Sequence, residues 1–218
     1  MGLVLTDISA IEAYRRDPVL GQRPPVALPF GKIRGLNLVR PRAAELREFD
    51  QRGYASFSRP VHVLVPHRDM RMAANDVRWH VWSGSLPKSG AGFRRDAQDV
   101  FLASPELALL HYASHADLAD AIALAFELCG TYRLGGLLGF EKADPLTSAK
   151  RLNWFASGVQ GARGAKRLRR IADRALDGSA SPMETALAML LSLPCALGGY
   201  GLPPPRLNAR IDVSSKNG

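Results

Sequence analysis

The chain is poor in cysteine and has no long apolar run. Its 218 residues include two cysteines, Cys129 and Cys195, which do not form a Cys-x-x-Cys pair. Two thiols are too few for a disulfide framework, so we expect both to stay reduced. No apolar run approaches the roughly 18–20 residues of a membrane span, and the first ten residues lack the basic and apolar regions of a secretory signal. These absences argue against a membrane protein and predict a cytoplasmic location.

Several sequence signatures of enzymes are absent as well. There is no Gly-x-x-x-x-Gly-Lys-Ser/Thr loop and no Gly-x-Ser-x-Gly elbow, which argues against P-loop nucleotide hydrolysis and serine hydrolase chemistry. His111 and His115 are spaced like two zinc ligands on one helix, but Tyr112 replaces the Glu of His-Glu-x-x-His and no nearby Cys or acid completes the set. We therefore predict no metal site. His62 and His80 are expected to pack or to face solvent.

Acidic residues are outnumbered by basic ones. Lys+Arg 29 against Asp+Glu 20 gives a net charge of +9, and most of the basic residues are arginine. The excess lies in residues 1–100 and 146–178, separated by an acidic segment at 101–145. Because the planar arginine fork suits phosphate and carboxylate, we expect a polyanionic partner for these segments.

Hydrophobic periodicity predicts an α+β protein, with a small antiparallel sheet and a mainly helical middle and C-terminal part. Helical spacing and caps predict helices at 6–16, 41–52, 104–113, 117–129, 146–157, 162–176 and 181–193. Alternating β-branched and aromatic residues at 61–65 and 77–82 predict two antiparallel strands joined by a basic loop. Further strands are expected at 97–102 and 207–213.

Two groups of basic residues are candidates for nucleic-acid contact. The members are Arg163, Lys166, Arg167, Arg170 and Arg174 on the helix at 162–176, and Arg68 and Arg71 beside the predicted hairpin. Several arginines on one face neutralise phosphates and release counterions. The alternative is a solvated outer face of an amphipathic helix, which needs no partner. Trp79 and Trp82 would add to this contact surface unless they belong to the core.

The sequence Ser181-Pro182-Met183-Glu184 precedes an apolar run and matches Ser-x-x-Glu. This pattern is typical of a capping box, in which the Ser oxygen accepts from a helical amide and the Glu reaches back to the cap. The alternative is that Glu184 is an active-site acid, which requires further carboxylates around it. Downstream of Glu184, the only further carboxylate side chain in the sequence is that of Asp212.

The order of several motifs between residues 60 and 213 resembles a family of bacterial proteins related to AbiEi-type antitoxins. The motifs are VHVLVP (61–66), VFLASPELALLHYA (100–113), ELCGTY (127–132), PLTSAKRLNWF (145–155), SPMET (181–185) and LPPPRLN (202–208). In many members the same helical region leads into a Vsr-like nuclease fold of the PD-(D/E)XK type. The resemblance implies that Glu184 is the helix glutamate beside the nuclease active site.

The chain departs from the nuclease pattern. Such a fold continues with an Asp on one strand and Glu-x-Lys on the next, and neither follows the segment at 207–213. We do not assign the Asp role to Asp212. The chain is therefore expected to be catalytically incomplete, with no cofactor unless a divalent metal ion joins a complete nuclease unit.

The resemblance divides the chain into three parts. We expect an N-terminal arm at 1–59, an α+β AbiEi-like region at 60–178, and the start of a nuclease-like unit at 179–218. The leading hypothesis is a cytosolic bacterial nucleic-acid-associated protein of defence or toxin–antitoxin type, with DNA as its partner. The alternatives are an antitoxin-like module that binds a toxin-like protein, and a truncated metal-dependent DNA endonuclease. Residues 1–59 show no clean helix-turn-helix, which argues against promoter binding.

Overall fold

The structure, a computed structural model, describes residues 3–17, 19–20, 48–49, 53–71, 75–82, 87, 93–95, 100–136 and 139–209. The helices are α1 (Asp7–Arg16), α4 (Pro105–Ala113), α5 (Leu118–Cys129), α6 (Ala149–Gly158), α7 (Ala165–Ala172) and α8 (Pro182–Ser192), with short 3-10 turns η3 (Arg68–Met70) and η4 (Cys195–Leu197). The strands are β1 (Val4–Leu5), β2 (Val61–Val65), β3 (Val77–Val81), β4 (Arg94–Arg95), β5 (Phe101–Leu102), β6 (Tyr132–Leu134) and β7 (Phe140–Lys142). The α+β class is confirmed.

The main sheet has five strands in the order β3-β2-β1-β5-β4. Its central strand, β1, runs antiparallel to β2 and parallel to β5. The N-terminal segment thus supplies the middle of the sheet, and α1 follows β1 after one residue. A second, two-stranded antiparallel sheet of β6 and β7 was not predicted from the sequence.

The predicted antiparallel pairing of 61–65 with 77–82 is wrong, because β2 and β3 are parallel. Val61 lies opposite Val77 and Val65 opposite Val81. Parallel strands need a crossover of about a dozen residues, and the segment at 66–76, which contains η3, has the length to make one. The sheet is therefore mixed rather than antiparallel. Strand alternation identified both strands, but it carries no information on their relative direction.

Most of the predicted helices are present, with small differences at their ends. The helix expected at 162–176 is shorter, since α7 ends at Ala172. Of the helix expected at 41–52, only residues 48 and 49 are described, and both are helical. The strand expected at 97–102 is reduced to β5, with residues 96–99 outside the described part. Residues 207–209 are not a strand, and the rest of that expected strand, including Asp212, lies outside the described residues.

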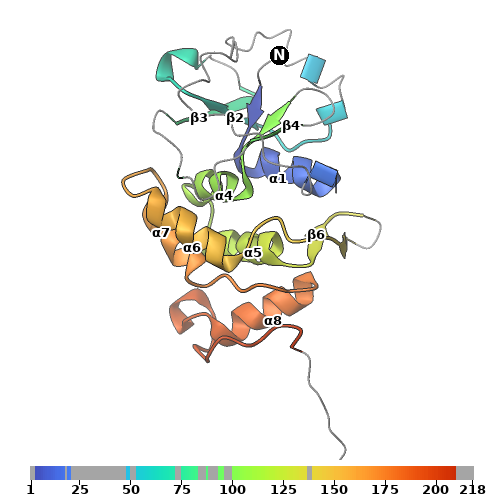
Figure 1. Cartoon of the computed structure of the whole chain (residues 1–218), viewed down its shortest axis with the longest axis vertical. Coiled ribbons are helices and arrows are strands. Elements are labelled where there is room, and N and C mark those ends of the chain that lie inside the picture. Colours follow the sequence, from blue (N-terminus) through green and yellow to red (C-terminus); the bar gives the residue numbers. More distant parts are fainter. Residues whose placement is uncertain are drawn as a thin grey trace, which may run out of the picture.

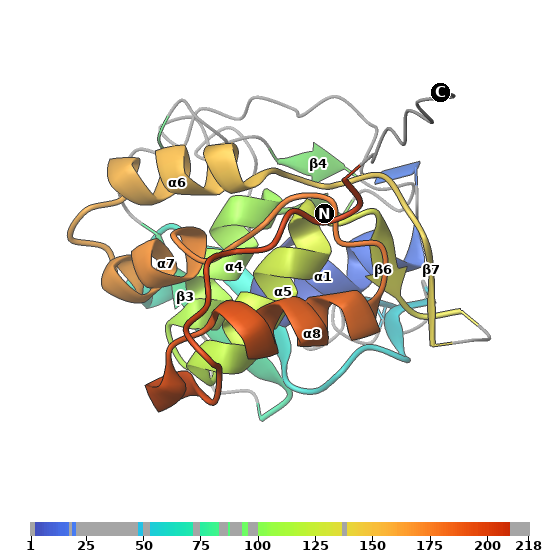
Figure 2. The same ribbon diagram turned by 90° about the horizontal axis from the view of Figure 1, so that it is seen from below.

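The helices lie in layers beneath the sheet (Figure 1). Helices α1 and α4 are next to it, α5, α6 and α7 follow, and α8 is farthest from it. Figure 2 shows the same layers from the side of α8, with α5 behind it. In the described part of the chain, no helix has the length and apolar character needed to cross a membrane.

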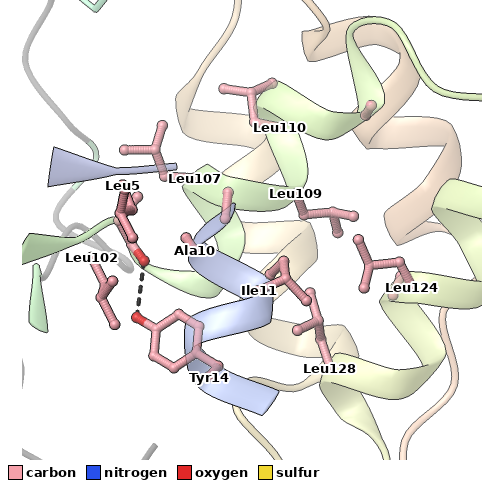
Figure 3. Packing of buried hydrophobic residues seen from close by; sticks show 14 of the residues in the cluster. Leu5, Ala10, Ile11, Tyr14, Leu102, Leu107, Leu109, Leu110, Leu124 and Leu128 are labelled. Atoms are coloured by element: carbon pink, nitrogen blue, oxygen red, sulfur yellow. Dashed lines mark hydrogen bonds between the residues drawn. The ribbon is translucent and has the colours of Figure 1, made fainter. Parts of the chain in front are cut away.

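One hydrophobic core runs from the sheet into the helices, and α1 and α4 carry much of it (Figure 3). Ile11, Leu109 and Leu128 are almost completely buried there. The Tyr14 hydroxyl donates a buried hydrogen bond of 2.9 Å to the carbonyl oxygen of Ala103. This bond joins α1 to the residue that follows β5, so helix and sheet are held in one relative position.

Replacing Tyr14 with Phe should lower the free energy of unfolding by about 1–3 kcal/mol, because the Ala103 carbonyl loses a buried donor. Urea denaturation followed by circular dichroism measures the change. Tyr200→Phe is the matched control, since that side chain is 68% exposed, and we expect it to change stability by less than about 0.5 kcal/mol. Equal effects of the two variants would contradict this assignment.

Candidate functional site

The centre of the candidate site is Asp7, the first residue of α1. Its side chain is fully buried, and its backbone has a φ of 55°, a region that non-glycine residues rarely adopt. Such a conformation costs on the order of 1–3 kcal/mol and persists only where the surroundings enforce it. The Ile8 N–H donates a hydrogen bond of 2.7 Å to Oδ1 of Asp7. This bond fixes the carboxylate and leaves Oδ2 for other partners.

Three histidines surround Oδ2 of Asp7. The distances from this oxygen are 3.1 Å to Nδ1 of His62, 3.3 Å to Nε2 of His80 and 2.7 Å to Nε2 of His115. The three rings come from β2, from β3 and from the turn after α4. A single carboxylate oxygen thus connects the two strands with the helical layer.

The parallel pairing of β2 with β3 brings two of these rings together. His80 lies opposite Leu64, and because side chains alternate along a strand, it shares a face with His62. Nδ1 of His62 and Nε2 of His80 are 2.9 Å apart. The ring of His111 lies beside that of His80, with centroids 4.8 Å apart. Four of the five histidines of the chain therefore form one cluster, which we call the histidine centre together with Asp7.

Helix α4 positions the other two histidines. Its N-cap is Ser104, whose Oγ accepts a hydrogen bond of 3.3 Å from the Leu107 N–H. Near its other end, Nδ1 of His111 is hydrogen-bonded to Oγ1 of Thr6 at 2.7 Å. His115 follows two residues after the helix ends. Thr6 and Asp7 at the start of α1 thus bind one histidine each from the end of α4.

The electrostatics of the centre favour an ionised Asp7 and neutral His80 and His111. Burial opposes ionisation of Asp7, but the hydrogen bonds and charges of His62, His80 and His115 outweigh it and lower its pKa to about 2. Burial, aided by the neighbouring histidines, lowers the pKa of His80 to about 3. Burial also lowers the pKa of His111 to about 4. Near pH 7 the centre therefore presents a carboxylate beside the neutral imidazoles of His80 and His111.

This combination of groups is able to hold a metal ion. Oδ2 of Asp7, Nδ1 of His62 and Nε2 of His80 all lie within 4.8 Å of one another. A carboxylate with neutral imidazoles is a donor set for zinc, iron and similar divalent ions. An ion in this position would act as a Lewis acid and lower the pKa of bound water. The two histidines considered from the sequence, His111 and His115, are not among these three donors, which come from β2, β3 and the start of α1.

A cavity of about 900 Å³ adjoins the histidine centre. His80, His111 and His115 line the part of the cavity next to that centre. Four exposed arginines also line it: Arg68, Arg71, Arg78 and Arg163. The half-buried Trp79 and Trp82 complete an aromatic part of the wall. The cavity thus combines imidazoles, guanidinium groups and indole rings.

A close approach of backbones brings Arg163 to the cavity. Gly164, with a φ of 89°, precedes α7, and a Cβ atom added there would lie 2.8 Å from the Leu110 carbonyl oxygen. Only glycine fits this contact without displacement of the backbone. In addition, a guanidinium nitrogen of Arg167 donates to the carbonyl oxygen of Ala116, next to His115. Two contacts therefore hold the start of α7 against the end of α4.

The structure separates the predicted nucleic-acid-binding residues into two groups. Arg68, Arg71 and Arg163 line the cavity. The remainder do not: Lys166 and Arg170 are exposed on α7, Arg167 contacts Ala116, and Arg174 donates a hydrogen bond of 2.7 Å to the Arg170 carbonyl oxygen. The histidine centre itself was missed, since its members are far apart in the sequence.

Glu184 lies in the predicted capping box. Its N–H donates to Oγ of Ser181 at 3.1 Å, and its Oε2 accepts from the Ala180 N–H at 2.6 Å and from Nδ2 of Asn208 at 3.1 Å. The carboxylate thus accepts from the residue before the N-cap rather than from the N-cap itself. Helix α8 is the layer farthest from the sheet (Figure 1), so Glu184 is not brought to the histidine centre. Its catalytic role remains a prediction.

Comparisons of the chain with models of protein families, with curated proteins and with solved structures found no match.

Acid should destabilise the metal-free protein. His80 and His111 have folded-state pKa values of about 3 and 4, below the ordinary value near 6.5 of the unfolded chain. The unfolded state therefore binds more protons below pH 6.5, and stability falls as pH decreases. Between pH 7 and pH 5 we expect a loss of about 1–2 kcal/mol for each histidine. Urea denaturation with a chelator present measures it. A stability that is equal at the two pH values would contradict the assignment.

Proposed function

We propose that the protein binds nucleic acid through the arginine-lined cavity beside the histidine centre. The observation that supports this proposal most directly is the gathering of Arg68, Arg71, Arg78 and Arg163 around one cavity. These arginines come from the β2–β3 crossover, from β3 and from the loop before α7, so they form a site that the fold assembles. Guanidinium groups in this arrangement suit the oxygens of a phosphate.

The aromatic part of the cavity favours a nucleotide strand over a simple anion. Trp79 on β3 and Trp82 just after it line the same cavity as the arginines and the histidines. Stacking of a base on an aromatic ring contributes about 1–3 kcal/mol and tolerates any sequence. The volume of about 900 Å³ lies within the range of about 300–1,000 Å³ typical of ligand sites. The cavity therefore suits a phosphate group together with an adjoining base.

The biological setting that we propose is bacterial defence or a toxin–antitoxin system, in the cytoplasm. It is supported by the resemblance of residues 60–213 to relatives of AbiEi-type antitoxins. The net charge of +9 is compatible with a DNA partner.

Removing two cavity arginines should weaken binding more than removing two basic residues elsewhere. We expect Arg68→Ala with Arg163→Ala to lower affinity for a single-stranded or duplex oligonucleotide. The slope of log K against log salt should become shallower by about 0.7–0.9 for each phosphate that is no longer neutralised. Electrophoretic mobility shift over a salt series measures both quantities.

The matched control is Lys142→Ala with Arg206→Ala. Both residues are exposed and outside the cavity, and the double variant removes the same charge. Equally weakened binding in the two double variants would show that net charge alone drives it. Affinity independent of salt would overturn the proposal.

A second function, an antitoxin-like module that binds a toxin-like protein, is favoured by the outer surface of α8. Met183, Leu187 and Leu190 are 78%, 55% and 46% exposed, and their spacing of four and three residues places them on one helix face. Tyr200 and Leu202 extend the exposed apolar surface. Apolar helix faces of this kind are used in recognition between proteins.

This second function predicts that Leu187→Asp weakens a complex with the product of the adjacent gene at least tenfold. The charge would be buried in the interface at high cost. Isothermal titration calorimetry of the two purified proteins measures the affinity. Val19→Asp is the control, because Val19 is 51% exposed and lies outside α8. Absence of a complex with the unaltered chain would argue against the second function.

A further inference from the structure

We propose that Asp7, His62 and His80 form a binding site for one divalent transition-metal ion, with zinc as the reference ion. The remaining coordination positions of the ion would open to the cavity and take water or an oxygen of a phosphate group. The site follows from the positions of three donor atoms that the fold brings together from β2, β3 and the start of α1.

The spacing of the three donor atoms fits a single ion. They form a triangle with sides of 2.9 Å between the histidine nitrogens, and 3.1 Å and 3.3 Å from these nitrogens to Oδ2 of Asp7. Zinc binds nitrogen and oxygen at about 2.0–2.2 Å, which separates neighbouring ligands by about 2.9 Å in an octahedron and about 3.4 Å in a tetrahedron. All three sides fall within this interval. The triangle thus has the dimensions of one face of a metal coordination shell.

Hydrogen bonding alone does not satisfy this triangle well. A neutral imidazole carries one N–H and one lone pair, and His62 and His80 direct one nitrogen each toward the other and toward the same oxygen. Two N–H groups cannot both point into a space this small, and two inward lone pairs would repel Oδ2. One inward N–H with one inward lone pair satisfies the contact between the rings but leaves that lone pair facing the carboxylate oxygen. A cation in the middle accepts all three lone pairs. A bound ion therefore gives all three inward-facing atoms a favourable contact, which shared protons alone do not.

Neighbouring groups hold the donors in place. The Ile8 N–H holds Oδ1 of Asp7, and Nε2 of His115 lies 2.7 Å from Oδ2, where it can donate to a coordinating carboxylate. Hydrogen bonds of this kind orient metal ligands and tune their basicity. His115 is 31% exposed at its side chain and lines the cavity. The supporting groups thus come from the backbone of α1 and from the cavity wall.

The cavity reaches the site at His80. This residue belongs both to the donor triangle and to the cavity wall, so a further ligand of the ion would approach from the side that the arginines line. One carboxylate leaves a divalent ion with a net positive charge, which favours an anionic additional ligand. The coupling to phosphate rests on the nucleic-acid binding proposed above, whereas metal binding itself does not.

Metal binding is tested on the whole chain, freed of metal by a chelator and then titrated with Zn²⁺ against a chromophoric competitor. We expect one Zn²⁺ per chain. Asp7→Asn and His80→Ala should each lower the affinity by at least about tenfold, since even supporting residues of metal sites contribute about 10–100-fold. Asn tolerates the positive φ of position 7, so this variant retains the backbone.

His67→Ala is the matched control. His67 is the fifth histidine of the chain, is exposed, and follows the end of β2. We expect its removal to leave Zn²⁺ affinity unchanged. Circular dichroism of each variant confirms folding, and His62→Gln replaces His80→Ala if the latter fails to fold. The absorption spectrum of bound Co²⁺ gives an independent readout of nitrogen and oxygen ligands.

The outcomes separate the two proposals. Failure of the unaltered chain to bind Zn²⁺ better than His80→Ala overturns the metal site, whatever the result with nucleic acid. If bound Zn²⁺ raises the affinity for inorganic phosphate, and phosphate raises the affinity for Zn²⁺ by the same factor, the open coordination position is supported. Zn²⁺ binding with no effect on phosphate affinity overturns the phosphate coupling and leaves a closed metal site.

Discussion

The carboxylate of Asp7 is the interaction on which the arrangement of the site depends. It is fully buried and ionised, and a buried charge is costly unless it is paired and hydrogen-bonded. The partners that satisfy it are histidines from β2, from β3 and from the turn after α4. The same residue begins α1 with a backbone conformation that most residues avoid. Packing and hydrogen bonds from several elements must therefore hold it in place.

The cavity lies beside this cluster. The contacts of His80 and His115 with Asp7 link β3 to the turn after α4, and the loop before α7 lines the space beside them. Gly164 and Arg167 secure that loop and the start of α7 against α4. Of the cavity arginines, Arg78 lies on β3, which also carries His80, while the others come from the segment after β2 and from the loop before α7. A metal ion and a phosphate group would bind to parts of one assembly.

Local signals predicted much of the fold. The helices predicted from Ser104, Asp117 and Ser181 are present, and the side chain of each of these residues accepts a hydrogen bond from a helix amide. The period-two segments at 61–65 and 77–82 contain the strands β2 and β3. Their relative direction was predicted wrongly, because alternation describes faces and not pairing. The register of the two strands, in which His80 lies opposite Leu64, places His62 and His80 on one face.

The site was harder to predict than the fold, since the partners of His111 and His115 are Thr6 and Asp7, more than a hundred residues away. Asp7 itself is indistinguishable in sequence from an ordinary helix-start acid. Contacts between distant segments depend on topology, which periodicity does not contain.

The most direct test of the metal site is the anomalous diffraction of crystals grown or soaked with Zn²⁺, recorded on both sides of the zinc absorption edge. We expect one strong peak about 2.0–2.2 Å from Oδ2 of Asp7, Nδ1 of His62 and Nε2 of His80. We also expect this peak to be absent from crystals of Asp7→Asn. An anomalous map without a peak at these three atoms, with the side chains in the positions described, would contradict the proposed site.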